Sequence, residues 1–251
     1  MRILPGVLKE LMKHVPTVLF EVVEWKVLMH ELPKLSRRLL QKEGFDSLFS
    51  QQRQYLEAFG IDLVTTHDSG PRATSSEDMA KKILGLYFAQ LFSPHGLFLD
   101  LGPNHLDMKD QRLIFNPNGL WTKFRPEFSQ GLKQIYDGFF LEQENLFHEG
   151  LLACGLTSNS WPIEDRLALA HLFKSHFGPS LTEKMSFDLE TFKASFFKIA
   201  DFMLEKKVII STDFLYLGIA LVTLYSSLER AKTPLNVKEV YRSVRSQLDA
   251  H

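Results

Sequence analysis

Residues 79–104 read MAKKILGLYFAQLFSPHGLFLDLGPN, and three patterns in this stretch decide the expected fold. Its first part carries apolar residues at helical spacing, which are Met79, Ile83, Tyr87 and Leu91. This stripe predicts a helix that ends before Pro94. The apolar run at 97–99 follows Gly96 and predicts a short strand. The residues behind the run are typical of a turn, and they include Asp100, Gly102 and Asn104.

The chain breaks up after this stretch and then turns helical again. Glycine and proline interrupt residues 94–126 and leave a second apolar run at 113–115, which predicts another short strand. Beyond Pro126 the spacing predicts helices at 128–141, 143–154, 163–177, 189–205, 213–228 and 237–248. The two clearest stripes are Phe128-Leu132-Ile135-Phe139 and Phe192-Phe196-Ile199-Met203. The expected fold class is mainly α (α+β), with a short strand pair around 97–115 packed on a helical body.

Upstream of residue 79 the pattern is mixed. Residues 4–14 predict a short helix, and the β-branched runs at 18–23 and 27–31 predict a β-hairpin or two adjacent strands. The pattern is helical from residue 34, and a second helix is expected over 48–59. Residues 65–76 (TTHDSGPRATSS) are polar and contain a Gly-Pro pair, which predicts a mobile loop.

Composition indicates an ordinary globular protein. The chain has 251 residues, and 29 basic side chains nearly balance 30 acidic ones, for a net charge of -1. That balance argues against nucleic acid as a partner. The single cysteine, Cys154, allows no internal disulfide, so a reducing, cytoplasmic compartment is expected. We also expect no secretory signal, because the start of the chain lacks the usual charged, apolar and small-residue order.

The longest apolar run, FLYLGIALVTLY at 214–225, is the one candidate for a membrane segment. It is shorter than the roughly 20 residues that a spanning helix needs, so we expect a buried core helix. Its expected buried positions include Leu217, Leu221 and Leu224.

Common catalytic and metal-binding patterns are weak in this sequence. His171 and His176 are five residues apart, off one helical face, and His105 with Asp107 would need further ligands to hold a metal. Ser195 opens an S-x-x-K match inside an amphipathic helix, without the partner motifs of that chemistry. Structural roles are therefore expected for these side chains.

Several stretches, taken in chain order, are similar to one family. Residues 14–33 (HVPTVLFEVVEWKVLMHELP) resemble a strand pair that ends at the hinge between kinase lobes, with Glu31 at the hinge. Residues 98–104 (FLDLGPN) resemble a catalytic loop of the form F-H-A-D-P-H-P-G-N, and 110–115 (DQRLIF) resemble the turn and strand before a Leu-Asp-Phe-Gly motif. The similarity resumes at 124–156, 208–228 and 234–237. The chain thus resembles the C-terminal lobe of the UbiB/AarF family of kinase-like proteins.

The resemblance implies a helical kinase-like C-lobe over 34–251, preceded by a remnant of the N-lobe over 1–33. Phosphoryl transfer by such a fold needs a lysine on the phosphates, a metal ion and a carboxylate near the attacking oxygen. The family's metal-binding Asp falls on Pro117, which has no side-chain oxygen to offer magnesium. The resemblance supplies no counterpart of the phosphate-binding lysine.

Two alignments of the catalytic loop stay open. One makes Asp100 and Asn104 remnants of the family's catalytic Asp and Asn, although their spacing of four is one residue tighter than the family's. The gapless alternative puts Leu101 and Leu106 at those positions. A plain turn at 100–104 is the further interpretation, and even the first alignment makes a poor magnesium site.

These observations lead to three hypotheses. The first is a noncatalytic pseudokinase that acts by binding a protein partner, in the family context of ubiquinone biosynthesis and lipid metabolism. It predicts no firmly held cofactor, with magnesium-ATP bound weakly or not at all near Glu31, and it leaves peripheral membrane contact open. The second is an ATP-dependent kinase or ATPase half, completed by a separate N-lobe chain, in which Asp100 and Asn104 are active. The third is a helical regulator unrelated to kinases.

Overall fold

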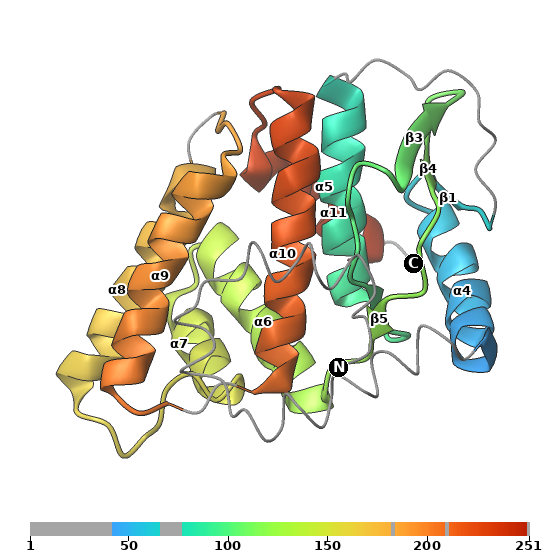
Figure 1. Ribbon diagram of the computed structural model, residues 1–251. Coiled ribbons are helices and arrows are strands. Elements are labelled where there is room, and N and C mark those ends of the chain that lie inside the picture. Colours follow the sequence, from blue (N-terminus) through green and yellow to red (C-terminus); the bar gives the residue numbers. More distant parts are fainter. Residues whose placement is uncertain (1–41, 66–76, 182–183, 209–210, 250–251) are drawn as a thin grey trace, which may run out of the picture. The chain divides into compact units, whose positions relative to one another are not determined.

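The computed structural model describes residues 42–65, 77–181, 184–208 and 211–249 (Figure 1). They divide into two compact units, each considered by itself. The first, here called the helical unit, takes in Phe124–Pro179 and Glu190–Gly218. The second, here called the mixed unit, takes in residues 42–123, Ser180–Leu189 and residues 219–249. Helix α10 (Thr212–Ala231) begins in the helical unit and continues in the mixed unit.

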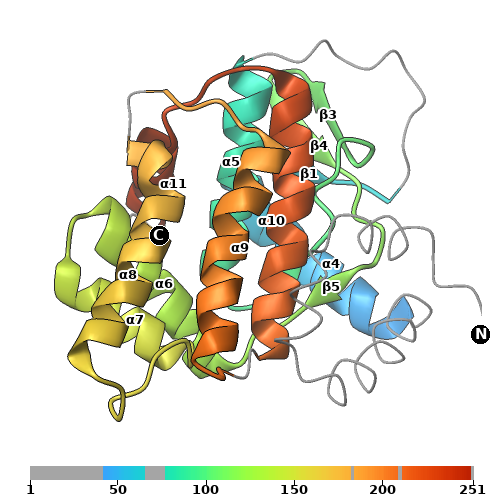
Figure 2. The same cartoon turned by 60° about the vertical axis from the view of Figure 1, so that its left-hand side comes forward.

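Aromatic stripes hold the helical unit together. Its elements are α6 (Pro126–Phe140), α7 (Glu144–Ala153), α8 (Ile163–Phe177), α9 (Leu189–Glu205) and the start of α10. Both predicted stripes, on α6 and on α9, are buried. Figure 2 shows α8 beside α9, and the ion pair between Lys206 and Asp165 (2.8 Å) and the contact of Trp161 with Phe202 link these helices. The buried apolar faces explain why helices form here, since packing supplies most helical stability.

Glycines let α6 and α7 approach each other closely. A Cβ on Gly138 would collide with the backbone nitrogen of Phe147, and one on Gly150 would lie 2.6 Å from the carbonyl oxygen of Gly131. Because backbone atoms cannot rotate away as a side chain can, these positions require glycine. Phe139 adds ring contacts with Phe147, so that the helix pair is held by close backbone approach and by aromatic packing.

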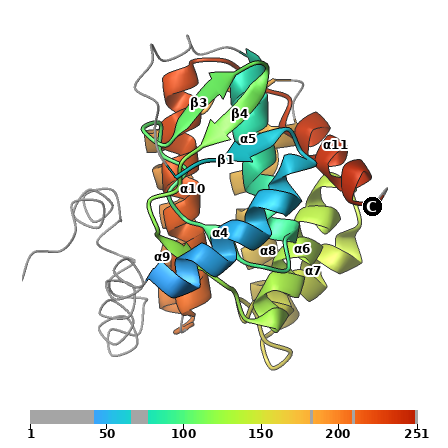
Figure 3. The ribbon, with the colours of Figure 1, turned by 90° about the vertical axis from the view of Figure 1, so that its right-hand side faces the viewer.

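The mixed unit combines helices with two small sheets. Its elements are α4 (Lys42–Glu57), β1 (Ile61–Leu63), α5 (Glu77–Phe92), β2 (Leu97–Phe98), β3 (Leu106–Lys109), β4 (Arg112–Phe115), β5 (Trp121–Thr122), the rest of α10 and α11 (Val237–Asp249). A 3₁₀ turn, η1 (Gly178–Leu181), crosses the boundary between the units. One sheet has the order β1-β4-β3, with β1 parallel and β3 antiparallel to β4, and β2 pairs with β5 in an antiparallel ladder. Figure 3 shows the three-stranded sheet beside α5.

Helix α5 lies at the core of the mixed unit. Its neighbour α11 packs on it through an edge-to-face contact of Phe88 with Tyr241, with ring centroids 5.0 Å apart. At the end of α5, the side-chain oxygen of Gln90 accepts a hydrogen bond from the backbone of Phe98 at 2.7 Å. The buried amide thereby fixes β2 relative to the helix that precedes it.

The predicted fold class, mainly α with small sheets, is confirmed. The bounds of α8 and α9 agree with the prediction, and α5, α6, α7, α10 and α11 agree within a few residues. Helix α4 begins at Lys42, six residues before the predicted start at 48. Phe45 extends its apolar face, since it contacts Phe49 one turn further on. Residues 1–33, including the expected hairpin and Glu31, the start of the helix expected from 34 and nearly all of the predicted loop 65–76 lie outside the described residues.

Two details of the prediction need correction. The runs at 97–99 and 113–115 do form strands, but they lie in different sheets, because each pairs with a strand that the sequence did not reveal. Leu221 was expected inside the protein, yet it is only half-buried, while Leu217 and Leu224 are buried as expected. The inward face of α10 also includes Thr223 and Ser227, which shifts the buried stripe away from Leu221.

None of the helices in the described ranges is both long enough and apolar enough to cross a membrane.

Candidate functional site

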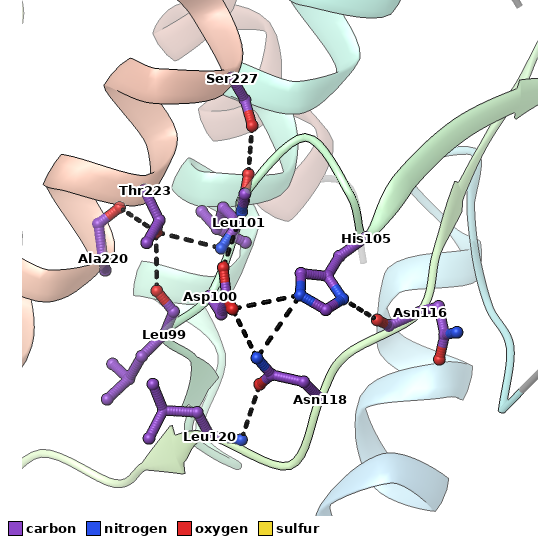
Figure 4. Close-up of polar contacts among 11 residues, drawn as sticks. Leu99, Asp100, Leu101, His105, Asn116, Asn118, Leu120, Ala220, Thr223 and Ser227 are labelled. Atoms are coloured by element: carbon purple, nitrogen blue, oxygen red, sulfur yellow. Dashed lines mark hydrogen bonds and ion pairs between the residues drawn. The ribbon is translucent and has the colours of Figure 1, made fainter. Parts of the chain in front are cut away.

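A loop of the mixed unit, residues 99–105 between β2 and β3, is fastened to α10 by two hydroxyl groups (Figure 4). Thr223 Oγ1 donates to the carbonyl of Leu99 at 2.8 Å and accepts from the backbone N–H of Leu101 at 3.1 Å. Ser227 Oγ donates to the carbonyl of Leu101 at 2.5 Å. The two hydroxyls are four residues apart and so lie on one face of the helix. They satisfy buried backbone groups that the short strand β2 leaves unpaired.

Strand pairing brings a second segment, residues 116–118, against this loop. The β2–β5 ladder continues beyond its strands, because the N–H of Leu99 donates to the carbonyl of Leu120 at 2.8 Å. Asn118 lies just before this contact, and its Oδ1 accepts from the N–H of Leu120 at 3.1 Å. That bond orients the amide so that Nδ2 points toward Asp100.

Three side chains meet between the loop and the segment, and we call them the Asp100 cluster: Asp100, His105 and Asn118. Oδ1 of Asp100 accepts from the N–H of Gly102 at 3.0 Å. Oδ2 accepts from Nδ2 of Asn118 at 2.5 Å and lies 3.2 Å from Nε2 of His105. Asp100 is only 6% exposed, and a buried carboxylate needs such partners to offset its lost hydration.

The imidazole of His105 bridges the two segments. Its Nδ1 lies 2.9 Å from the carbonyl oxygen of Asn116, and since a carbonyl only accepts, Nδ1 carries a hydrogen. Its Nε2 faces Asp100 on the other side. The hydrogen bond with Asp100 raises the pKa of His105 above its ordinary value of 6.5, against the opposing effect of burial, and the bond with the Asn116 carbonyl adds to the rise.

Of the candidate catalytic residues predicted from the sequence, the structure places only Asp100 in the cluster. Asp100 lies at the centre of the cluster, whereas Asn104 is exposed on the same loop. The residues of the gapless alignment, Leu101 and Leu106, are both buried in the apolar core. Pro117 is buried beside Asn118.

Sequence reasoning missed two members of the cluster and both hydroxyl anchors. The sequence pairs His105 only with Asp107, whose Oδ1 instead accepts from the backbone of Met108 at 2.8 Å. Asn118 follows Pro117 in a stretch where the resemblance assigns a role only to position 117. A usable signal existed for the anchors, since Thr223 interrupts the apolar run 214–225 and Ser227 follows it at a spacing of four.

A second polar contact lies in the helical unit. Nδ1 of His176 is 2.7 Å from Oγ of Ser195, and that hydroxyl also lies 2.9 Å from the carbonyl of Phe192 on its own helix. Burial lowers the pKa of His176 to about 4, so the ring is neutral at pH 7. Burial likewise raises the pKa of the Cys154 thiol to about 12, which keeps it protonated and unreactive. These contacts have the character of core packing.

Within the described ranges, no group of three or more His, Cys, Asp or Glu side chains is arranged to hold a metal ion. No protein-family model matches the sequence, and no curated protein matches it either.

Proposed function

We propose that this chain is a noncatalytic kinase-like protein of the UbiB/AarF type, a pseudokinase that acts by binding a partner protein. The family context of the proposal is quinone and lipid metabolism. Its support comes from the mixed unit, where the candidate catalytic loop and the candidate metal-binding turn lie side by side.

The order of elements supports the kinase-like part of the proposal. Helix α5, strand β2, the loop 99–105, the β3–β4 hairpin and the segment 116–118 follow one another in the order that the resemblance requires. A kinase-like reaction needs its catalytic Asp and its metal-binding Asp close together. Asp100 contacts Asn118, which directly follows Pro117, the position aligned with the metal-binding Asp, so the two aligned positions lie near each other. This proximity favours the alignment that uses Asp100 over the one that uses Leu101.

The burial and hydrogen bonding of the Asp100 carboxylate are the observation that supports a noncatalytic role. A general base must present a free oxygen to the substrate, and a magnesium ligand must present one to the ion. Both oxygens of Asp100 already accept hydrogen bonds from Gly102 and Asn118, and the carboxylate is buried. At the neighbouring position Asn118 offers Asp100 an N–H donor, and Pro117 offers no oxygen at all. Chemistry at Asp100 would first require the buried carboxylate to become accessible.

Nucleotide binding and hydrolysis test the proposal directly. We expect no saturable binding of magnesium-ATP by the purified full chain below ~1 mM, the weak end of typical substrate affinities, and no strong metal dependence of any binding. Phosphate release should not exceed that of Asp100→Asn. Pro117→Asp alone should not create turnover, since Asp100 would still be buried and bonded to Asn118.

A second variant separates a binding role from a catalytic one in cells. Asn104 is exposed, so Asn104→Ala should fold normally while removing the second candidate catalytic side chain. If the protein acts by binding in quinone metabolism, cells lacking it should contain less quinone, and Asn104→Ala should restore the content as well as the natural sequence does. Unchanged quinone in the deleted cells contradicts the family context. ATP hydrolysis that disappears in a folded Asp100→Asn variant favours the kinase or ATPase half instead.

A further inference from the structure

The Asp100 cluster joins two segments that are otherwise separate in the chain. The loop 99–105 follows β2, while 116–118 follows β4, and the hairpin β3–β4 lies between them in sequence. Asp100 and His105 belong to the loop, and Asn118 and the carbonyl of Asn116 belong to the second segment. The N–H of Asn116 also donates to the carbonyl of His105 at 2.9 Å, so the backbone holds the two segments together where they meet the hairpin. The side chains of the cluster set how firmly the remaining part, around Asp100 and Asn118, is held.

Hydrogen-bond geometry decides which protonation state of His105 suits this arrangement. Nδ1 donates to the carbonyl of Asn116, so a neutral ring would point the lone pair of Nε2 at Oδ2 of Asp100, 3.2 Å away. Two acceptors at that distance repel each other. A ring protonated on both nitrogens instead donates to Asn116 and to Asp100 at once, with a charge-assisted bond to the carboxylate.

From this geometry we propose that the Asp100 cluster is a pH-responsive clasp, closed when His105 carries a proton and loosened when the proton leaves. The neutral ring keeps its bond to Asn116 and retains one other link, because Nδ2 of Asn118 lies 3.5 Å from Nε2 and can offer its second hydrogen there. That distance is at the limit of a hydrogen bond. Loss of the proton thus replaces a charge-assisted bond with a weak neutral one.

Among the described residues, Asp100 is the ionisable group in contact with the ring of His105 and governs this titration. The ring is flanked by Gly102 on the loop and by Asn116 and Asn118 on the second segment, and Asp100 is the ionisable side chain among these contacts. Helix α10 faces the loop with the uncharged hydroxyls of Thr223 and Ser227. The raised pKa of His105 has the same first cause, its hydrogen bond with Asp100.

The sign of the pH effect follows from that shift. His105 titrates at an ordinary value of 6.5 in the unfolded chain and at a higher value in the folded protein. The clasp is therefore closed below pH 6.5 and opens as the pH rises through the raised pKa. This inference is independent of any kinase-like role, because it rests only on the contacts of the cluster.

Nitrogen NMR of the histidine rings in the full chain tests the clasp. We expect both ring nitrogens of His105 to be protonated at pH 6.5, with a titration midpoint above that value. In Asp100→Asn the midpoint should fall to 6.5 or below, since burial then outweighs the remaining bond to Asn116. The matched control is Glu144→Gln, which removes the carboxylate of the exposed His148–Glu144 pair and should leave the His105 midpoint unchanged. A natural midpoint at or below 6.5, or one that Asp100→Asn does not move, overturns the proposal.

Hydrogen exchange supplies a test that does not depend on Asp100→Asn folding. The N–H groups of Gly102 and Leu120 bond to Asp100 and Asn118, so their protection factors should fall several-fold as the pH rises through the His105 midpoint. In His105→Gln both factors should stay constant across the same range. The N–H of Phe98, bonded to Gln90, is the internal reference and should not change. Equal pH dependence in the natural chain and in His105→Gln would rule the clasp out.

Discussion

His176 in the helical unit and His105 in the mixed unit are both partly shielded from water, yet their surroundings drive their charges in opposite directions. His176 lies against the rings of Phe177, Phe192 and Phe196 and stays neutral. His105 faces a buried carboxylate, which favours its charged form. The helical unit is thus held by apolar packing, and the loop of the mixed unit by polar contacts. Packing contacts tolerate little change of volume, while polar contacts depend on complete hydrogen bonding.

The largest effect is expected where packing in the helical unit is tightest. Gly138→Ala places a methyl group against the backbone of Phe147, so α6 and α7 must move apart, and we expect a loss of about 3 kcal/mol in unfolding free energy. Urea denaturation measures it. The control is Gly218→Ala on α10, where a Cβ meets nothing within 4 Å and helix propensity predicts a gain of up to ~1 kcal/mol. Similar results for the two variants would contradict the close packing.

A somewhat smaller loss is expected from a polar deletion in the mixed unit. Thr223→Val keeps the shape of the side chain but leaves the carbonyl of Leu99 and the N–H of Leu101 without their partner, which should cost about 2–3 kcal/mol. Thermal or urea unfolding checks the value. Ser246→Ala removes an exposed hydroxyl bond on α11 and should change stability by less than about 0.5 kcal/mol. A harmless Thr223→Val would mean that α10 does not anchor the loop.

The neutral ring of His176 and the protonated ring of His105 predict opposite dependences of stability on pH. The unfolded chain binds a proton at His176 near pH 6.5, whereas the folded protein does so only near pH 4. The contribution of His176 is therefore present above pH 6.5 and is lost as the pH falls toward 4, by about 1–2 kcal/mol for a half-buried ring. The contribution of His105 is present below pH 6.5 and is lost as the pH rises.

Carboxylates also titrate between pH 4 and 7 and change the stability. Comparison of the natural chain with His176→Gln separates the contribution of His176 from theirs. Urea denaturation at pH values from 4 to 7 measures the unfolding free energy. As the pH falls, this free energy should decrease less in His176→Gln than in the natural chain, and the difference between the two curves is the contribution of His176. Parallel curves would show that the helical unit does not keep this ring neutral.

The smallest effect concerns backbone strain in the β3–β4 hairpin. Its turn holds Asp110 and Gln111 at φ values of 49° and 62°, a left-handed conformation that suits glycine. Gln111→Gly should raise the unfolding free energy by about 0.5 kcal/mol, since relief of strain slightly exceeds the added freedom of the unfolded chain. Lys109→Gly, in strand β3 beside the turn, is the control and should destabilise. A loss in Gln111→Gly would contradict the strained turn.

The helices could be predicted because their signal is local. The stripe Phe192-Phe196-Ile199-Met203 lies within one helix, so its spacing alone indicated α9 and its buried face. The strands could not be predicted as well. Strands β2 and β5 have two residues each, too few for an alternating pattern to appear, and their pairing joins residues more than twenty positions apart.

The candidate site likewise has features that the sequence predicts and features that only the fold decides. The turn-forming character of Asp100 and the missing side-chain oxygen at Pro117 are properties of the sequence itself, because they depend only on residue type. The meeting of Asp100 with Asn118, and of Leu99 with Thr223, spans 18 and 124 positions along the chain. No local pattern encodes such contacts, since chain folding and strand register decide which distant side chains face each other. The sequence by itself therefore determined the helices and the absence of a carboxylate at position 117, whereas only the tertiary structure decided that Asp100 is buried and bonded to Asn118, with His105 against it.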